Sequence, residues 1–291
     1  FGQTSSRNLG YTLLRAALSN DQLTFDRVLN WTLTNQQDPL TGVFYAQTQS
    51  LDNVVTVVNP ASSSEADQFI AYALLVADDN WPSSNYDVTA KQVADSIWLS
   101  ETITLQGNQY LVAGTWSAQS GRKRYVTSPA SFMPHLYTRL AELTADDKWI
   151  RLRDQMYSVV ETCSLTPAGN YLPPDWCDVN ARGEVLSESE IGAESPVYGY
   201  EAFRTLWNIG IAARVDGDLR AHTYLDNLTI FAQDWAAKKR IYTRYARNEF
   251  PLKEESSLDN NVAMLAYFVG RDELGSAKEL YDAEISPNFR Q

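Results

Sequence analysis

The sequence has few of the residues from which many catalytic centres are built. It contains only two histidines and two cysteines in 291 residues, and the four are not grouped at metal-ligand spacing. It also lacks a phosphate-cradling glycine loop and a Gly-x-Ser-x-Gly turn. We therefore predict no metal site and no cofactor, and we expect His135, which follows Pro134, to pack at the start of a helix.

Basic residues are scarce as well. The chain has 24 lysines and arginines against 36 aspartates and glutamates, a net charge of −12. An acidic surface repels phosphate backbones and anionic headgroups, so nucleic acid and membrane surfaces are excluded as partners. No run approaches the roughly 20 apolar residues of a membrane span. No secretion signal is visible either, and we interpret the start at Phe1 as processed or trimmed.

Cys163 and Cys177 flank a loop that contains proline and glycine, Ser164 to Trp176. They could close this loop as a disulfide, which would favour an oxidising compartment, or remain two buried thiols. Aromatic residues are plentiful, with eight tryptophans and sixteen tyrosines. Most will fill the core, and a surplus would suit stacking against the flat C–H faces of sugar rings.

Apolar residues recur mainly at helical spacing. The pattern predicts about ten helices, with short extended pieces within residues 40–60 and 104–126. The predicted helices cover Leu9–Leu18, Phe25–Leu33, a segment from Ser62 through Leu75, Val88–Ser100, Pro129–Leu143, Asp146–Glu161, Val197–Ala213, Asp218–Ala237, Leu258–Val269 and Glu273–Ile285. We expect one all-α domain, residues 1–291, of antiparallel helical hairpins around an axis. Because a closed ring of hairpins needs about twelve helices, one is expected before Phe1 or was missed.

Two pairs of charged residues stand at predicted helix starts. Ser62 and Glu65 have the spacing of a capping box, so Glu65 and the nearby Asp67 could either cap the helix or point into a cleft. Glu201 and Arg204 lie three residues apart on an otherwise apolar helix. They could form a local ion pair, or Arg204 and Tyr200 could orient a reactive carboxylate.

A rigid turn, Pro173-Pro174-Asp175-Trp176, presents one acid and one tryptophan. Together with three other segments it resembles glycoside hydrolase family 8, the (α/α)6-barrel endoglucanases. The other segments are Ser6-Arg7-Asn8-Leu9-Gly10-Tyr11 with its continuation to Trp31-Thr32, Ser64-Glu65-Ala66-Asp67 with the apolar helix after it, and Tyr200-Glu201-Ala202-Phe203-Arg204. They occur in family order, and the likeness is greatest to the periplasmic cellulases that accompany bacterial cellulose synthesis.

The resemblance implies an inverting reaction in which one acid protonates the leaving oxygen and one base activates water. The family's acid falls on Arg7, which cannot donate a proton near neutral pH. The base falls on Glu201, and the two aspartates of the second segment fall on Glu65 and Asp67. Three explanations stay open. Another acid has taken over, with candidates Glu188, Glu190 and Glu194; the chain binds glycan without hydrolysis; or Arg7 pairs with an acidic substrate.

We therefore expect an (α/α)6 barrel that acts on, or only binds, a β-1,4-linked glucan-type polysaccharide. The expected catalytic residues are Glu201, Glu65, Asp67 and Arg7. The expected substrate-binding residues are Tyr11, Trp31, Tyr45, Tyr137, Asp175, Trp176, Tyr200 and Arg204. We further expect a monomer in the periplasm or outside the cell, linked to an exopolysaccharide system.

Overall fold

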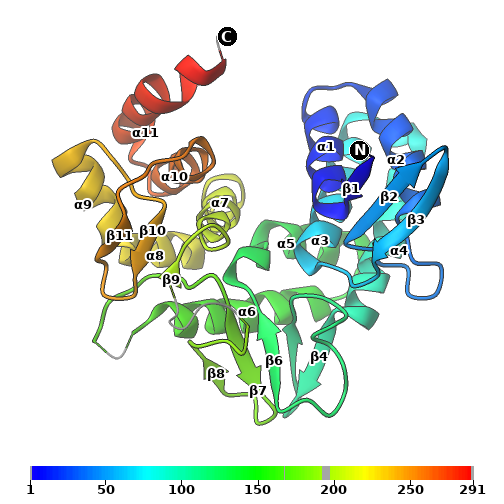
Figure 1. Cartoon of the computed structure of the whole chain (residues 1–291), viewed down its shortest axis with the longest axis horizontal. Helices are drawn as coiled ribbons and strands as arrows, with labels where there is room; N and C mark the ends of the chain where they lie inside the picture. Colours follow the sequence, from blue (N-terminus) through cyan, green and yellow to red (C-terminus); the bar gives the residue numbers. More distant parts are fainter. Residues whose placement is uncertain (1, 167, 192–196, 290–291) are drawn as a thin grey trace. The chain divides into compact units, whose positions relative to one another are not determined.

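The chain is predominantly helical in a computed structural model that describes residues 2–166, 168–191 and 197–289. This part contains eleven α-helices and only short strands, which confirms the all-α class with β pieces in loops (Figure 1). None of its helices is long and apolar enough to cross a membrane. The chain divides into two compact units, one of Phe1–Arg122 and Leu136–Leu152, the other of Lys123–His135 and Arg153–Gln291.

Unit 1 is built from helices and two small antiparallel sheets. One sheet has the strand order β1-β2-β3, and the other is the β4-β5 hairpin. The helices are α1 (Ser6–Leu18), α2 (Gln22–Asn35), α3 (Ser64–Asn80), α4 (Tyr86–Ser100) and most of α5 (Pro134–Thr144). The strands are β1 (Gln3–Ser5), β2 (Gln47–Leu51), β3 (Val54–Asn59), β4 (Thr102–Leu105) and β5 (Asn108–Leu111).

The centre of unit 1 is α3, which is buried on almost every side from Ser64 to Leu75. A helix that is apolar all round belongs in a core, and α1 and α4 both pack against it. At Gly10 the backbone of α1 comes so close to α3 that a Cβ atom would lie 2.9 Å from the Cβ of Phe69. This glycine therefore permits the close crossing that brings the start of α1 to the start of α3.

Unit 2 carries two three-stranded antiparallel sheets and the remaining helices. The strand orders are β6-β7-β8 and β11-β10-β9. The helices are most of α6 (Lys148–Ser164), then α7 (Phe203–Ile211), α8 (Leu219–Asn227), α9 (Thr229–Lys238), α10 (Leu258–Gly270) and α11 (Leu274–Leu280). The strands are β6 (Arg124–Thr127), β7 (Cys177–Asn180), β8 (Val185–Leu186), β9 (Val197–Tyr198), β10 (Arg244–Ala246) and β11 (Pro251–Lys253).

The core of unit 2 is rich in aromatic side chains. Phe231 contacts Tyr198, Tyr245 and Tyr267 with ring centroids 5.0–5.7 Å apart. Such tilted and edge-on pairs stabilise beyond the area they bury. In this core the aromatic residues serve packing, as the sequence predicted for most of them.

Three predicted helices are wrong in their boundaries. The helix expected over Val197–Ala213 begins with strand β9 and a turn, and α7 starts only at Phe203. The helix expected over Asp218–Ala237 is broken at Leu228, whose carbonyl accepts a hydrogen bond from the Tyr267 hydroxyl at 2.6 Å. The helix expected from Pro129 starts anew at Pro134, because a proline disfavours helical backbone in the residue before it.

Candidate active site

The first cluster of predicted site residues lies in unit 1, where α1 and α3 begin. The Ser5 side chain caps α1 by accepting a hydrogen bond from the Asn8 N–H at 3.2 Å. The close helix crossing then places Nη2 of Arg7 3.0 Å from Oε2 of Glu65. Two residues 58 positions apart in the sequence are thus joined in one ion pair.

The two partners of this ion pair differ in exposure. The Glu65 side chain is 3% exposed, whereas that of Arg7 is 36% exposed. The buried carboxylate is compensated by the guanidinium, because an unpaired buried charge would be strongly destabilising. The group that this pair presents to solvent is therefore a cation.

The predicted capping box at Ser62 is wrong. The N-cap of α3 is Ser63, whose side chain makes no capping hydrogen bond. The Ser62 hydroxyl instead donates to Oε1 of Glu101 at 2.6 Å, and Glu65 pairs with Arg7. Both side chains therefore bond to residues that are distant in sequence, and they do not form the capping box.

Asp67, which is expected to be a catalytic residue, lies beneath the surface. Its side chain is fully buried, and its Oδ2 accepts a hydrogen bond from the Phe44 N–H at 3.3 Å. Burial and the neighbouring charge of Glu101 hold the pKa of Asp67 well above its usual range. Burial also raises the pKa of Glu101 to about 8.

The four aromatic residues of unit 1 that are expected to bind substrate are not equivalent. Tyr11 is exposed and meets Phe69 edge-on, and Trp31 and Tyr45 are half-buried. Tyr137 is fully buried, and its ring is stacked on Trp149 at 6.0 Å. The prediction for Tyr137 is wrong, because an apolar ring at a helix position most often fills the core.

The second cluster lies in unit 2, around the turn that precedes α7. Oδ1 of Asp175 accepts hydrogen bonds from the backbone N–H groups of Glu201 at 3.0 Å and Ala202 at 2.8 Å. A Cβ atom at Gly199 would lie 2.6 Å from Oδ2 of Asp175, so only glycine fits there. Burial raises the pKa of Asp175, while these backbone hydrogen bonds act in the opposite direction.

Glu201 therefore stands in this turn, and not on a helix as the sequence predicted. Its carboxylate pairs with Nη2 of Arg204, and Nη1 of Arg204 donates to the Tyr200 carbonyl at 2.9 Å. The Glu201 side chain is 25% exposed and that of Arg204 only 13%. Here the carboxylate faces outward and the guanidinium supports it from beneath.

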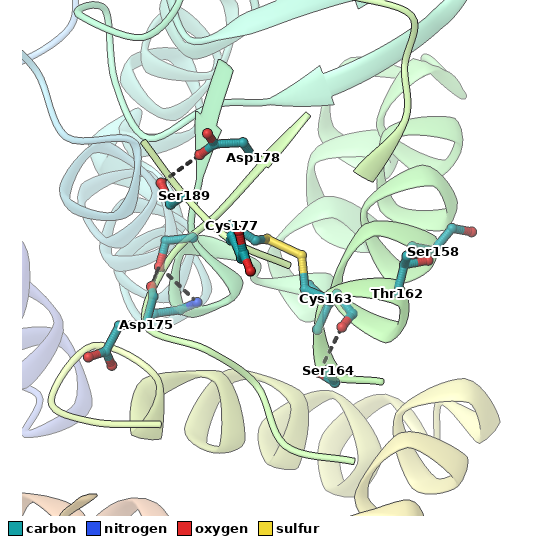
Figure 2. Close-up of a disulfide and its surroundings, with 12 residues drawn as sticks. Ser158, Thr162, Cys163, Ser164, Asp175, Cys177, Asp178 and Ser189 are labelled. Carbon is teal, nitrogen blue, oxygen red and sulfur yellow. Dashed lines mark hydrogen bonds between the residues drawn. A yellow bond between two sulfur atoms is a disulfide. The ribbon is translucent and has the colours of Figure 1, made fainter. Parts of the chain in front are cut away.

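A disulfide braces the loop that leads to Asp175 and Trp176. Cys163 at the end of α6 is bonded to Cys177 at the start of β7, with the two Cα atoms 6.3 Å apart. This confirms the disulfide alternative. Figure 2 shows the bond beside Asp178, whose Oδ1 accepts a hydrogen bond from Ser189 at 2.5 Å. Trp176, between the braced strand and Asp175, is half-buried.

Two of the three alternative acids lie on the segment after β8. Glu188 and Glu190 are both exposed. The segment is tied down because the Glu190 N–H donates to Asp178 at 2.9 Å. Glu194 lies outside the described residues.

Across the described ranges, no group of three or more His, Cys, Asp or Glu side chains could hold a metal ion. His135 is buried at the second position of α5, where the sequence predicted a packing residue.

Sequence reasoning missed two functional supports, Glu101 and Gly199. Glu101 follows α4 and pairs with residues 34 and 39 positions away, so no local pattern could reveal it. Gly199 immediately precedes the Tyr200-Glu201 motif, and a glycine at that point could have indicated a close approach.

Solved structures with a similar fold identify the fold class of the chain. The chain is similar to a β-1,3-1,4-glucanase from Paenibacillus sp. X4, with a TM-score of 0.84, 22% identity, and 98% of this chain and 78% of that one covered. It is also similar to an endo-1,4-D-glucanase from Vibrio fischeri, with a TM-score of 0.79, 20% identity, and coverage of 96% and 82%. These likenesses show the (α/α)6-barrel fold of glycoside hydrolases.

The family follows from the sequence. The model of glycosyl hydrolases family 8 matches residues 2–252, and the chain belongs to this family. It is 30% identical to Endoglucanase A of Acetivibrio thermocellus over 97% of its own length. The match spans 57% of that relative, so the chain corresponds to little more than half of it.

Proposed function

We propose that this chain acts on a β-1,4-linked glucan-type polysaccharide as an endo-acting glycoside hydrolase. The observation that carries the proposal is the turn of unit 2, where Glu201 faces outward on a backbone held by Asp175. Family membership and the likeness to Endoglucanase A support the substrate class.

In this proposal Glu201 is the general base. It accepts a proton from a water molecule, which attacks the anomeric carbon from the face opposite the leaving group, so that the configuration is inverted. Arg204 orients the carboxylate through the ion pair, and Asp175 holds the turn. Placement of this kind contributes to catalysis because it fixes the reacting groups before the reaction begins.

A second candidate function is glycan binding without turnover, and the Arg7–Glu65 ion pair favours it. A guanidinium keeps its proton at any pH near neutrality, so Arg7 cannot protonate a leaving oxygen. Glu65 is buried and engaged by Arg7. If hydrolysis does occur, its proton donor is another carboxyl, for which Glu188, Glu190 and Glu194 remain the candidates.

The side chains proposed to contact sugar are exposed or half-buried. They are Tyr11, Trp31, Tyr45, Trp176 and Tyr200. Asp175, expected to bind substrate, is proposed as a support for the Glu201 turn. The proposed setting is the periplasm or the cell exterior, which the disulfide supports because such bonds persist in oxidising compartments. A monomer and a link to exopolysaccharide synthesis complete the proposal.

The test is the release of reducing ends from carboxymethylcellulose, lichenan and chitosan, together with calorimetric binding of cellotetraose. Hydrolysis of a β-1,4-glucan by the wild type supports the hydrolase. Binding with no turnover at high protein concentration rejects the hydrolase and leaves the binding protein. If the protein neither binds cellotetraose nor hydrolyses any of these substrates, both candidate functions are rejected. Arg7→Glu then asks whether a carboxyl at that position restores turnover.

A further inference from the structure

We propose that Glu101 is a positioning residue: it shares one proton with Asp67, and this buried carboxyl pair holds the segments that carry Glu65 and Tyr45. The inference rests on the proposed function for the role of Tyr45 toward the sugar. It concerns residues of unit 1 alone.

The geometry requires a proton between the two carboxyl groups. Asp67 and Glu101 are both fully buried and hydrogen-bond to each other. Their other hydrogen bonds are accounted for by the Phe44 N–H on Asp67 Oδ2 and the Ser62 hydroxyl on Glu101 Oε1. No other donor among the described residues reaches Asp67 Oδ1 or Glu101 Oε2. Because an ionised carboxylate has no hydrogen to donate, the bond between them needs one shared proton.

The pair connects the segments on which the predicted sugar contacts stand. Asp67 anchors the backbone of Phe44, and the next residue is Tyr45. Glu101 anchors Ser62, three residues before Glu65, and Ser62 Oγ also accepts a hydrogen bond from the Thr115 N–H at 3.0 Å. One proton thus stabilises two loops and the start of α3 together.

Loss of that proton would place two negative charges side by side in the core. The Tyr137 phenol of α5 faces the pair, and burial together with the Glu101 charge raises its pKa. A phenol carries no positive charge, so it cannot compensate for this. Burial favours the protonated form, consistent with the pKa of about 8 for Glu101.

The sign of the pH dependence follows. Between the pKa of an unfolded glutamate, roughly 4.3, and the folded value, the native chain holds one proton that the unfolded chain has released. This proton makes the unfolding constant rise about tenfold per pH unit. The stabilisation is therefore complete below about pH 4 and is lost as the pH rises through about 8.

The test compares Glu101→Gln with the wild type and with Glu142→Gln, a matched change at an exposed position of α5. A glutamine keeps the hydrogen bond to Asp67 but cannot lose a proton there. Denaturant unfolding is measured from pH 5 to 9. We expect the free energy of unfolding to depend less steeply on pH in Glu101→Gln than in the other two proteins, by the equivalent of about one proton. Equal pH dependence in all three proteins would overturn the proposal. If Glu101→Gln does not fold, Asp67→Asn makes the same comparison from the other side of the pair.

Hydrogen exchange tests the positioning role without a substrate. The measured quantity is the protection of backbone amides from exchange, corrected for intrinsic exchange rates. In the wild type, protection of peptides containing residues 43–46 and 62–67 should fall about tenfold between pH 7 and 9. In Glu101→Gln it should not fall. Unchanged protection in the wild type would overturn the positioning role. Cellotetraose binding at the same pH values separates this result from the proposed function, since a failure to bind at any pH rejects only the function.

Discussion

Two arginine–glutamate pairs among the predicted site residues combine the same residue types but differ in which partner is the more exposed. In unit 1 the Glu65 side chain is buried and Arg7 is the more exposed partner; in unit 2 both side chains are partly buried, and Glu201 is the more exposed of the two. A presented carboxylate can accept a proton from water, whereas a presented guanidinium can only attract negative charge. The chemistry that each ion pair can support therefore depends on which partner is the more exposed.

The supports of the two pairs differ as well. Glu201 is held by a neighbour three residues away and by backbone hydrogen bonds to Asp175. Glu65 depends on the close crossing of two helices at Gly10. The unit 2 pair thus joins two neighbours in sequence and is supported by one tertiary contact. The unit 1 pair forms only because two helices pack together.

The largest expected effect comes from removing the outward carboxylate of unit 2. Glu201→Ala should lower kcat on carboxymethylcellulose about 10²- to 10⁴-fold with little change in KM, because a general base acts in the transition state. Reducing-end assays measure this. Glu142→Ala, which removes an exposed acid of α5, is the control expected to keep activity. Unchanged hydrolysis in Glu201→Ala would remove the base assignment.

The next largest effect is expected on stability, when the disulfide of unit 2 is removed. The Cys163–Cys177 bond closes a loop with a sequence separation of 14, so a double change to serine should cost about 3 kcal/mol. Urea unfolding with and without reductant measures it. Wild type under reducing conditions should match the double variant. A loss well below 1 kcal/mol would mean that hydrogen bonds alone hold the Asp175–Trp176 loop.

These contrasts show what the sequence could predict. The four motifs gave the family and the fold, because helical periodicity and motif order are local properties. The Arg204–Glu201 pair was predicted for the same reason. The partners of Ser62, Asp67 and Glu101 were not, since each lies 20 or more residues away and depends on how α3 and α4 pack. The break at Leu228 likewise depends on a tyrosine from another helix.

A smaller effect is expected from the unit 1 pair. Arg7→Met leaves the buried Glu65 carboxylate without its cation, which in a fully buried pair costs about 3–5 kcal/mol. Since Arg7 is 36% exposed, water screens part of this, and we expect about 2 kcal/mol at pH 7. Arg7→Met/Glu65→Gln should recover most of the stability, and no recovery would show that Arg7 acts by packing.

The smallest effect is expected from Arg204→Lys, which keeps the charge and removes the planar fork. The arginine holds the Glu201 carboxylate with one nitrogen and the Tyr200 carbonyl with another, and a lysine ammonium cannot reproduce both directions. We expect about 1 kcal/mol of stability to be lost, the value of one hydrogen bond. The expected fall in kcat is larger than this loss implies, about tenfold, because the base loses its orientation. A fall in stability with kcat unchanged would show that Glu201 is oriented by the Asp175 turn alone. In that case the outward carboxylate of unit 2 would owe its position to the backbone, and the resemblance between the two ion pairs would carry no catalytic meaning.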